Sequence, residues 1–283
     1  MAMLTLAPLL WAGNAVTGKL VHDLIPPDTL NFVRWTLAFL ILLPFAWKAV
    51  SPSSPMWQHW KRYCLLGLLG VGCYNALQYL ALGTSTPPNV TLVGASTPVF
   101  MLFIGAMFFG VPARREQIIG AVLSIVGVVL VLCRGSLEQL FALRLVVGDL
   151  YMVLAVISWS LYSWLLVRTK EPAEIRNDWA MFLIAQMLFG LGWSGAFAGI
   201  EWSIGQHEIL WSWKLAAAMA FIVVGPAIMA YRCWGLGVQR AGPVVAGFFI
   251  NLTPLFAAVL SLALLGEAPH LYHAAAFVLI VAG

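Results

Sequence analysis

Long apolar runs, each bounded by charged residues, proline or glycine, dominate the pattern of hydrophobic and polar positions along this chain. A helix needs about 20 predominantly apolar residues to cross the hydrocarbon core of a bilayer. Ten runs approach this length, and we predict a membrane-spanning helix in each: Met3 to Val21, Asn31 to Val50, Cys64 to Gly83, Pro88 to Gly110, Gln117 to Cys133, Gly148 to Arg168, Trp179 to Gly199, Lys214 to Trp234, Pro243 to Leu265 and His270 to Gly283. The remaining residues suffice only for short loops.

The composition supports the same class. Of the 283 residues, 62% are hydrophobic and 9% are charged, and the mean hydropathy is +0.92. An ordinary soluble domain has about 25% charged residues, so this chain lacks the charge to cover a water-soluble surface. The four cysteines lie in or at the ends of apolar runs without a histidine at metal-ligand spacing, so we expect them to pack and not to bind a metal. The predicted class is an all-α multi-pass membrane protein.

Lysine and arginine counts on alternate loops predict the orientation. With the N-terminus in the cytoplasm, ten of these residues lie on the cytoplasmic side and four on the outer side, with Arg34 inside the second run. Cytoplasmic loops carry the excess of positive charge in most membrane proteins, so we predict a cytoplasmic N-terminus. Orientation then accounts for the net charge of +4, and no nucleic-acid partner is expected.

The sequence also repeats itself. A shift of 156 residues sets Thr91 to Phe100 on Gly247 to Phe256, with both Thr-Pro pairs aligned. We predict a first five-helix half over residues 1–133, an external linker over 134–147 and a second half over 148–283, whose C-terminal end we expect to be incomplete. Because five is odd, the halves would enter the membrane from opposite faces. This inverted repeat is typical of secondary transporters, and a duplication retained only for packing is the alternative.

Several short motifs have the order and spacing of a known family. They are Trp11 and Gly13 in the first run, Arg34 in the second, Pro98 echoed by Pro254, Gly120 and Gly127 in the fifth, and Gly266-Glu267 after the ninth. Together they resemble the EamA-like ten-helix branch of the drug/metabolite transporter (DMT) superfamily over essentially the whole chain. Two positions depart from the pattern: Val111 follows Gly110 where the family has glutamate, and Phe182 stands where the repeat would place a partner for Arg34.

The resemblance implies two four-helix lobes that face a central cavity, with the fifth and tenth helices packed outside them. It also implies a protein of the bacterial cytoplasmic (inner) membrane that is similar to exporters of aromatic amino acids and other metabolites. The expected partners are a small-molecule substrate and the lipid bilayer. We expect no cofactor and no enzymatic activity, and the sequence is compatible with a monomer.

Prolines and glycines inside four runs mark expected irregularities in the helices. Pro98 and Pro254 lie at equivalent depths, and each is expected to free the carbonyl of the residue four positions earlier. Neighbouring polar side chains either bond that carbonyl or face a substrate, and both alternatives stay open; they are Ser96, Thr97, Asn251 and Thr253. We predict hinges in the third and eighth runs, with close helix packing as the alternative, at Gly70, Gly72 and Pro226.

Aromatic and amide side chains gather in the helices that the repeat places around a cavity. Such a lining suits an amphipathic solute, because rings stack on an apolar group while amides and hydroxyls orient its polar end. The predicted substrate-binding residues are Trp11, Asn14, Tyr74, Gln78, Tyr79, Trp159, Tyr162, Ser163, Tyr231 and Asn251. Helix packing is the alternative for each aromatic residue, and we assign Trp35 to the membrane interface.

Charged side chains are absent from the middle of the predicted spans, which favours facilitated transport over proton coupling. Arg34 is expected near the outer mouth, where it either extends to the interface or pairs with a substrate carboxylate. The leading hypothesis is an exporter of small metabolites, above all aromatic and hydrophobic amino acids. Cationic drugs, sugar phosphates and nucleotide-sugars are alternative solutes, and a membrane-embedded enzyme or a structural subunit are alternative functions.

Overall fold

The structure is a computed structural model of residues 1–283. It describes all residues except 22, 86, 134–135, 137, 139–140, 142–145, 169–170, 206 and 266–270, and it omits the side chains of 15, 19, 79, 82–83, 87–89, 131, 258, 261–265, 271 and 273. Most of the predicted linker and the Gly266-Glu267 motif lie outside the described residues. Throughout the described part, the regular elements are helices and no strand occurs.

The helices follow one another with short connections. In chain order they are α1 (Ala2–Val21), α2 (Pro27–Val50), the 3-10 turn η1 (Pro55–His59), α3 (Trp60–Gly67), η2 (Leu68–Cys73), α4 (Tyr74–Thr84), α5 (Pro87–Gly94), α6 (Thr97–Phe109), α7 (Arg115–Leu132), α9 (Val147–Val167), α10 (Ala173–Arg176), α11 (Trp179–Ile204), α12 (Trp213–Ile222), η3 (Val223–Met229), α13 (Ala230–Ala241), α14 (Pro243–Ile250), α15 (Leu252–Leu265) and α16 (Leu271–Ala282).

Five helical segments among the described residues are long and apolar enough to cross a membrane: Pro27–Val50, Val90–Phe109, Val147–Val167, Trp179–Ile204 and Trp213–Ala241. The all-α class is therefore confirmed. All ten predicted runs lie on helical segments, while the number of crossings and their direction stay predictions.

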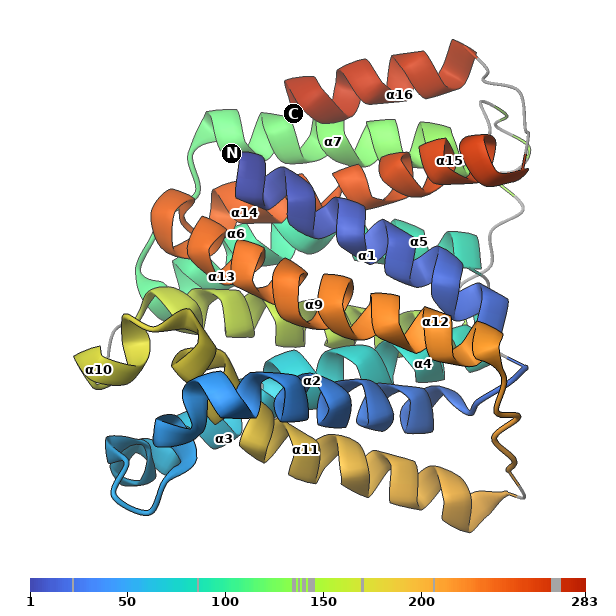
Figure 1. Ribbon diagram of the computed structural model, residues 1–283. Coiled ribbons are helices and arrows are strands. Elements are labelled where there is room, and N and C mark those ends of the chain that lie inside the picture. The colour runs from blue at the N-terminus through green and yellow to red at the C-terminus, as the bar shows by residue number, and fades with distance from the viewer. Residues whose placement is uncertain are drawn as a thin grey trace.

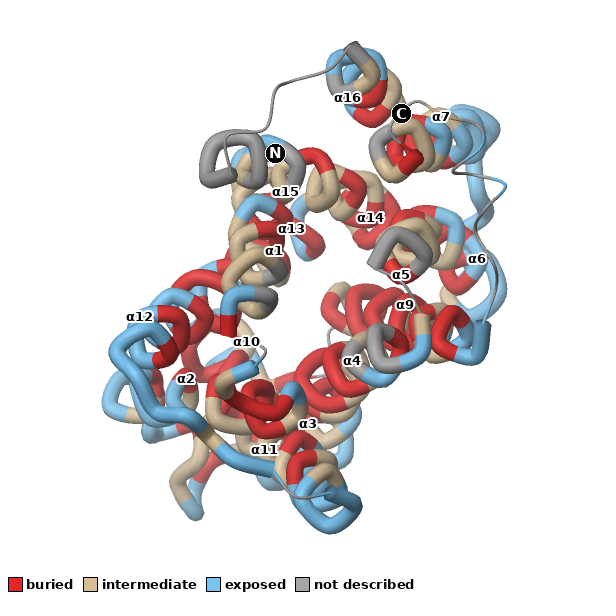
Figure 2. The backbone as a smooth tube through the Cα atoms, turned by 90° about the vertical axis from the view of Figure 1, so that its right-hand side faces the viewer, coloured by how far each residue is buried: buried red, intermediate tan, exposed pale blue. Residues whose placement is uncertain are grey.

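The long helices lie side by side across the molecule (Figure 1). α2 pairs with α11 at one edge, and α7 pairs with α16 at the opposite edge. Between these pairs, α1 packs on α13 and α15, while α9 packs on α4, α5 and α6. Figure 2, turned by 90°, shows buried residues on the helix faces that meet in the interior.

Small residues allow α7 and α16 to pack closely. A Cβ atom on Gly127 of α7 would lie 2.7 Å from Ile280 Cγ1 and 3.0 Å from the Ala276 carbonyl oxygen, both on α16. Contacts of this kind let two helix backbones approach in a bilayer, where lipid is as apolar as the side chains. Gly127 is therefore a packing residue of the α7–α16 contact.

Replacing Gly127 with alanine is expected to destabilise the protein by about 1–3 kcal/mol, because the added methyl group overpacks the α7–α16 contact. Gly192→Ala is the matched control, since a Cβ atom at Gly192 on α11 meets no atom within 4 Å. The control should gain about 1 kcal/mol from the higher helix propensity of alanine. Thermal midpoints in detergent therefore shift in opposite directions, and equal shifts would contradict the packing argument.

The two sites predicted as hinges adopt π-helical backbone. η2 contains Gly70 and Gly72, and η3 contains Pro226, so both irregularities occur where glycine and proline predict them. π-Helical turns inside α-helices often mark functional sites. Their role as hinges stays a prediction.

The first proline break is closed by local hydroxyl groups. α5 ends at Gly94, and α6 begins at Thr97 with Pro98 in its first turn, where a missing amide proton is tolerated. The Thr97 hydroxyl donates to the Gly94 carbonyl at 2.6 Å, and the Ser96 hydroxyl donates to the Val93 carbonyl at 2.5 Å. At Ser96 and Thr97 the structure therefore shows repair of the backbone.

The second break leads to a different contact. α14 ends at Ile250, and Pro254 lies in the first turn of α15. Between the two helices, the fully buried Asn251 amide donates to the Ser124 hydroxyl on α7 at 2.7 Å. Asn251 therefore ties the break to α7.

Candidate functional site

Aromatic rings from five helices meet in the interior around Trp159 of α9. The ring centroid of Trp159 lies 5.1–5.6 Å from those of five other rings, on Trp11, Tyr74, Tyr162, Tyr231 and Trp234. Trp35 of α2 joins them through an edge contact with Tyr231 at 4.8 Å. We call these seven residues the aromatic cluster. Edge and tilted contacts of this kind match the charge distribution of the rings and add to the energy of their burial.

The helical repeat explains how α9 presents its part of the cluster. Trp159, Tyr162 and Ser163 are spaced at i, i+3 and i+4 and therefore share one face. The Ser163 hydroxyl donates to the Trp159 carbonyl at 2.9 Å and accepts the Trp234 indole N–H at 3.1 Å. Ser163 is fully buried, so in this conformation it positions Trp234.

The π-helical segment η2 lies against the cluster. Three successive carbonyls accept side-chain hydrogen bonds from three other helices: Leu69 from Ser158 at 3.0 Å, Gly70 from the Tyr231 hydroxyl, and Val71 from Asn31 at 3.4 Å. A Cβ atom on Gly70 would lie 2.7 Å from the Tyr162 ring, so this close approach requires glycine. The predicted hinge at Gly70 is thus in direct contact with the predicted site.

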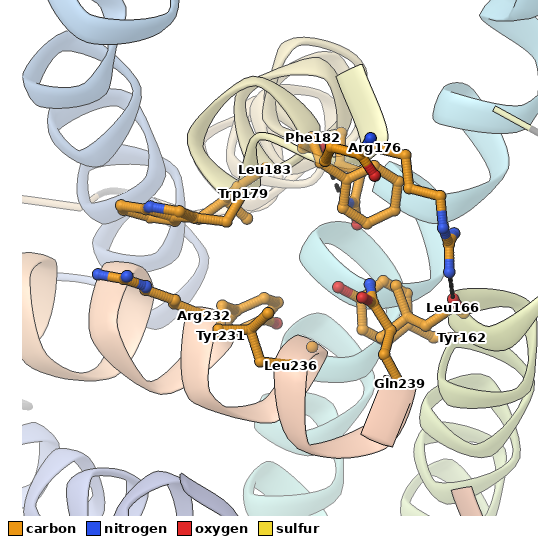
Figure 3. A pocket seen from close by; sticks show the side chains of 13 residues that line it. Tyr162, Leu166, Arg176, Trp179, Phe182, Leu183, Tyr231, Arg232, Leu236 and Gln239 are labelled. Atoms are coloured by element: carbon orange, nitrogen blue, oxygen red, sulfur yellow. Dashed lines mark hydrogen bonds between the residues drawn. The ribbon is translucent and has the colours of Figure 1, made fainter. Parts of the chain in front are cut away.

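A pocket of about 200 Å³ opens beside the cluster. It lies between the C-terminal end of α9, the start of α11 and the second half of α13, and its lining residues are Tyr162, Leu166, Arg176, Asn177, Trp179, Phe182, Leu183, Gln186, Tyr231, Arg232, Gly235, Leu236 and Gln239. Tyr162 and Tyr231 belong to both the pocket and the aromatic cluster. Figure 3 shows Trp179 and Arg232 on one side of the pocket, with Arg176 and Gln239 on the other.

The charge of the pocket is positive. Its lining residues include two arginines and no carboxylate. The Arg232 guanidinium lies over the Trp179 ring at 4.6 Å, a cation–π contact that leaves its charge near the pocket. Arg176 is partly compensated by Glu171, which lies 3.1 Å away and outside the lining. The pocket therefore favours an anionic or zwitterionic solute over a cationic one.

The structure brings together six of the ten predicted site residues. These six pack together in or against the cluster: Trp11, Tyr74, Trp159, Tyr162, Ser163 and Tyr231. Asn14 and Gln78 are half-buried, one turn after Trp11 and Tyr74 respectively, and the side chain of Tyr79 lies outside the described residues. Asn251 is not brought to the cluster, because its amide is bonded to α7.

Two sequence-based expectations are wrong. Trp35 is fully buried in the cluster and does not lie at the membrane interface. Arg34 does not extend to the interface, since only 4% of it is exposed and its guanidinium lies over Trp35. The error arose at the helix start: α2 begins at Pro27, four residues before the predicted Asn31, so Arg34 lies two turns inside the helix.

The polar half of the pocket was not predicted. Arg176 and Arg232 were counted only among the cytoplasmic cations that predict the orientation, and Gln186 and Gln239 were not singled out. One signal was present, because Trp179 and Arg232 both fall at ends of apolar runs near a proposed cavity. The two side chains meet because α11 and α13 cross. The residue pattern within one helix does not predict how that helix crosses another.

Comparison with known proteins decides the family. The EamA-like transporter family matches residues 1–133 and 146–283. The chain belongs to this family. An uncharacterized transporter of Archaeoglobus fulgidus is 25% identical over 283 residues, covering 99% of this chain and 94% of the relative. The aromatic amino acid exporter YddG of Ancylobacter novellus is 25% identical over 278 residues, covering 98% and 92%.

A solved crystal structure shares the fold of this EamA-like protein. The TM-score is 0.76 at 19% sequence identity, over 99% of this chain and 93% of the other. The family and the names of its relatives indicate a transporter and not an enzyme. Together with the apolar helices, they identify the chain as a multi-pass membrane protein.

Proposed function

We propose that this EamA-like protein exports small metabolites, above all amino acids with aromatic or hydrophobic side chains, across the bacterial cytoplasmic membrane by alternating access. The observation that carries the proposal is a positively charged pocket whose lining merges with the aromatic cluster. Rings suit the apolar side chain of such a solute, and arginine and glutamine suit its polar end. The similarity to an aromatic amino acid exporter supports the same substrate class.

Alternating access needs two halves that exchange roles, and paired features support ten helices in two inverted five-helix repeats. The π-helical segments η2 and η3 recur at a spacing close to the 156-residue shift, as do the breaks after α5 and α14. α2 pairs with α11, and α7 pairs with α16, as expected for corresponding helices of two related halves. The family match divides the chain close to the predicted halves.

The predicted orientation places the pocket at the cytoplasmic end. With the N-terminus inside, the C-terminal end of α9, the start of α11 and the end of α13 all reach the cytoplasmic side. These are the segments that line the pocket. A solute would then enter the site from the cytoplasm, which fits export.

Counterflow in proteoliposomes tests the proposal. Vesicles loaded with unlabelled phenylalanine should accumulate labelled phenylalanine above the outside concentration, and empty vesicles should not, because the outward gradient of unlabelled solute drives this accumulation. Tryptophan and methionine should compete, whereas a cationic drug or a sugar phosphate should not. Exchange of only the cationic drug or the sugar phosphate would show that the protein is a transporter but would refute amino acids as its substrates. Silence across the panel, from protein shown to be folded, would refute the proposed transport.

A further inference from the structure

A buried cation lies beside the aromatic cluster without an anionic partner. Arg34 is 4% exposed, and its guanidinium donates to the Asn31 amide oxygen at 2.8 Å and lies 5.2 Å from the Trp35 ring. Its Nε–H has no hydrogen-bond partner, and no carboxylate in the described part of the chain pairs with it. A neutral amide compensates a desolvated cation only in part, and unpaired charges at membrane depth usually mark substrate or ion sites.

Three further donors gather around the same point. The indole N–H groups of Trp35 and Trp159 are buried and have no partner among the described residues, and the buried Asn75 amide faces the Tyr231 hydroxyl as a hydrogen-bond donor. The Trp35 and Trp159 rings lie 4.8 Å and 5.6 Å from the Tyr231 ring, and Asn75 lies beside the Tyr231 hydroxyl. Buried polar groups in native proteins are nearly always hydrogen-bonded, so the three free donors on Arg34, Trp35 and Trp159 require an explanation.

We propose that Arg34, Trp35, Asn75 and Trp159, the donor cluster, receive the carboxylate of the transported solute. The chemistry is specific because all four groups donate, and a carboxylate offers only acceptors. An arginine–carboxylate contact is also the strong, charge-assisted kind. This inference rests on the proposed function and narrows its substrate class to solutes that carry a carboxylate.

Tyr231 connects the pocket to the donor cluster. It lines the pocket, while its ring contacts Trp35 and Trp159 and its hydroxyl is bonded to the Gly70 carbonyl in η2. Arg34 and Trp35 are outside the pocket lining, so the carboxylate reaches them when Tyr231 turns away from Gly70. The arginines at the pocket would attract the same carboxylate first, which gives a stepwise path for an anionic group.

A purely structural role for Arg34 is the competing explanation. Asn31 bonds both Arg34 and the Val71 carbonyl, so Arg34 would merely help to hold η2. Asn31→Asp separates the two roles, because it places a permanent carboxylate against the guanidinium. The variant also loses the donor to the Val71 carbonyl, so if Arg34 and Asn31 only hold η2, the thermal midpoint without solute falls. If Arg34 receives the solute, the internal carboxylate occupies it, and binding falls while the thermal midpoint without solute is unchanged or higher.

The experiment compares matched solutes with and without a carboxylate. Thermal stabilisation of the purified protein reports binding of phenylalanine against phenethylamine, and of 3-phenylpropionate against 3-phenylpropionamide. The wild type should be stabilised by the carboxylate member of each pair. Arg34→Gln should weaken that binding about 10- to 100-fold, the range for hydrogen bonds to charged groups. Arg240→Gln, at an exposed position outside the pocket, is the matched control and should keep wild-type binding.

The outcomes separate this inference from the proposed function. Loss of carboxylate preference in Arg34→Gln, and loss of binding in Asn31→Asp without a fall in its thermal midpoint, would support the donor cluster. Equal stabilisation by both members of each pair, or full carboxylate binding in Asn31→Asp, would overturn it and leave amino-acid transport standing. Absence of both binding and counterflow for every member of the panel would overturn the proposed function and the donor cluster together.

Discussion

Replacing Trp159 with alanine is expected to lower the transport efficiency for phenylalanine about 30-fold or more, equivalent to about 2 kcal/mol of lost binding energy. Trp159 contacts five other rings, including Tyr162 and Tyr231, which line the pocket. Its removal leaves a cavity behind those two rings, so they lose the surface against which they are positioned. Counterflow rates over a range of phenylalanine concentrations, normalised to folded protein, measure the effect.

Stability must be separated from transport in this variant. A buried tryptophan truncated to alanine also costs about 3–5 kcal/mol of folding free energy. Trp159→Phe keeps an aromatic ring and should retain most of the stability and part of the transport. Trp213→Ala removes the same side chain from a position that is 84% exposed and should change neither. Wild-type transport by folded Trp159→Ala protein would exclude the aromatic cluster from the binding site.

Much of the fold could be predicted from the sequence because a bilayer imposes simple rules. Every backbone polar group inside it must be bonded within the chain, so long apolar runs become helices. The runs predicted from hydropathy accordingly lie on the observed helices. Glycines and prolines also located both π-helical segments and both helix breaks.

The site was less predictable because it depends on how helices cross. The members of the aromatic cluster are far apart in the sequence, and only the repeat suggested that Trp11, Trp159 and Tyr231 would meet. Arg34 was misplaced because the second run was predicted to begin at Asn31, whereas Pro27 at the first helical position starts α2. Asn251 was assigned to a cavity although its amide finds a hydroxyl on α7, a partner that hydropathy does not reveal.

Glu171→Gln is expected to lower the free energy of unfolding by about 3 kcal/mol, because breaking a buried ion pair leaves its cations uncompensated. The Glu171 side chain is fully buried and bonds two arginines, Arg62 at 2.5 Å and Arg176 at 3.1 Å. Glutamine keeps the shape of glutamate but removes its charge. The thermal midpoint of the purified protein measures the loss. Glu174→Gln, three residues away and exposed, is the matched control and should leave the midpoint unchanged.

The Glu171 network also closes the C-terminal end of α9. Arg62 donates to the Leu165 and Arg168 carbonyls at 2.7 and 2.5 Å, and Arg176 donates to the Leu166 carbonyl at 3.1 Å. These carbonyls belong to the last turn of α9 and to its C-cap, where helices leave carbonyls short of backbone partners, and only Leu165 of the three is also bonded by the Arg168 N–H at 3.1 Å. Cations are also favoured there by the helix dipole. Glu171 therefore fixes the arginines that hold the end of α9.

This arrangement links the stability of the network to the pocket. Tyr162 and Leu166 line the pocket from the last turns of α9, so a loosened α9 end should also weaken solute binding. Replacing Arg62 and Arg176 with methionine in the Glu171→Gln background should restore part of the stability, because it removes the uncompensated charges. Solute binding should stay weak, because the α9 carbonyls remain without their arginine donors and the pocket has also lost the Arg176 cation. Recovery of both together would show that charge compensation alone, and not the capping of α9, is what the pocket requires.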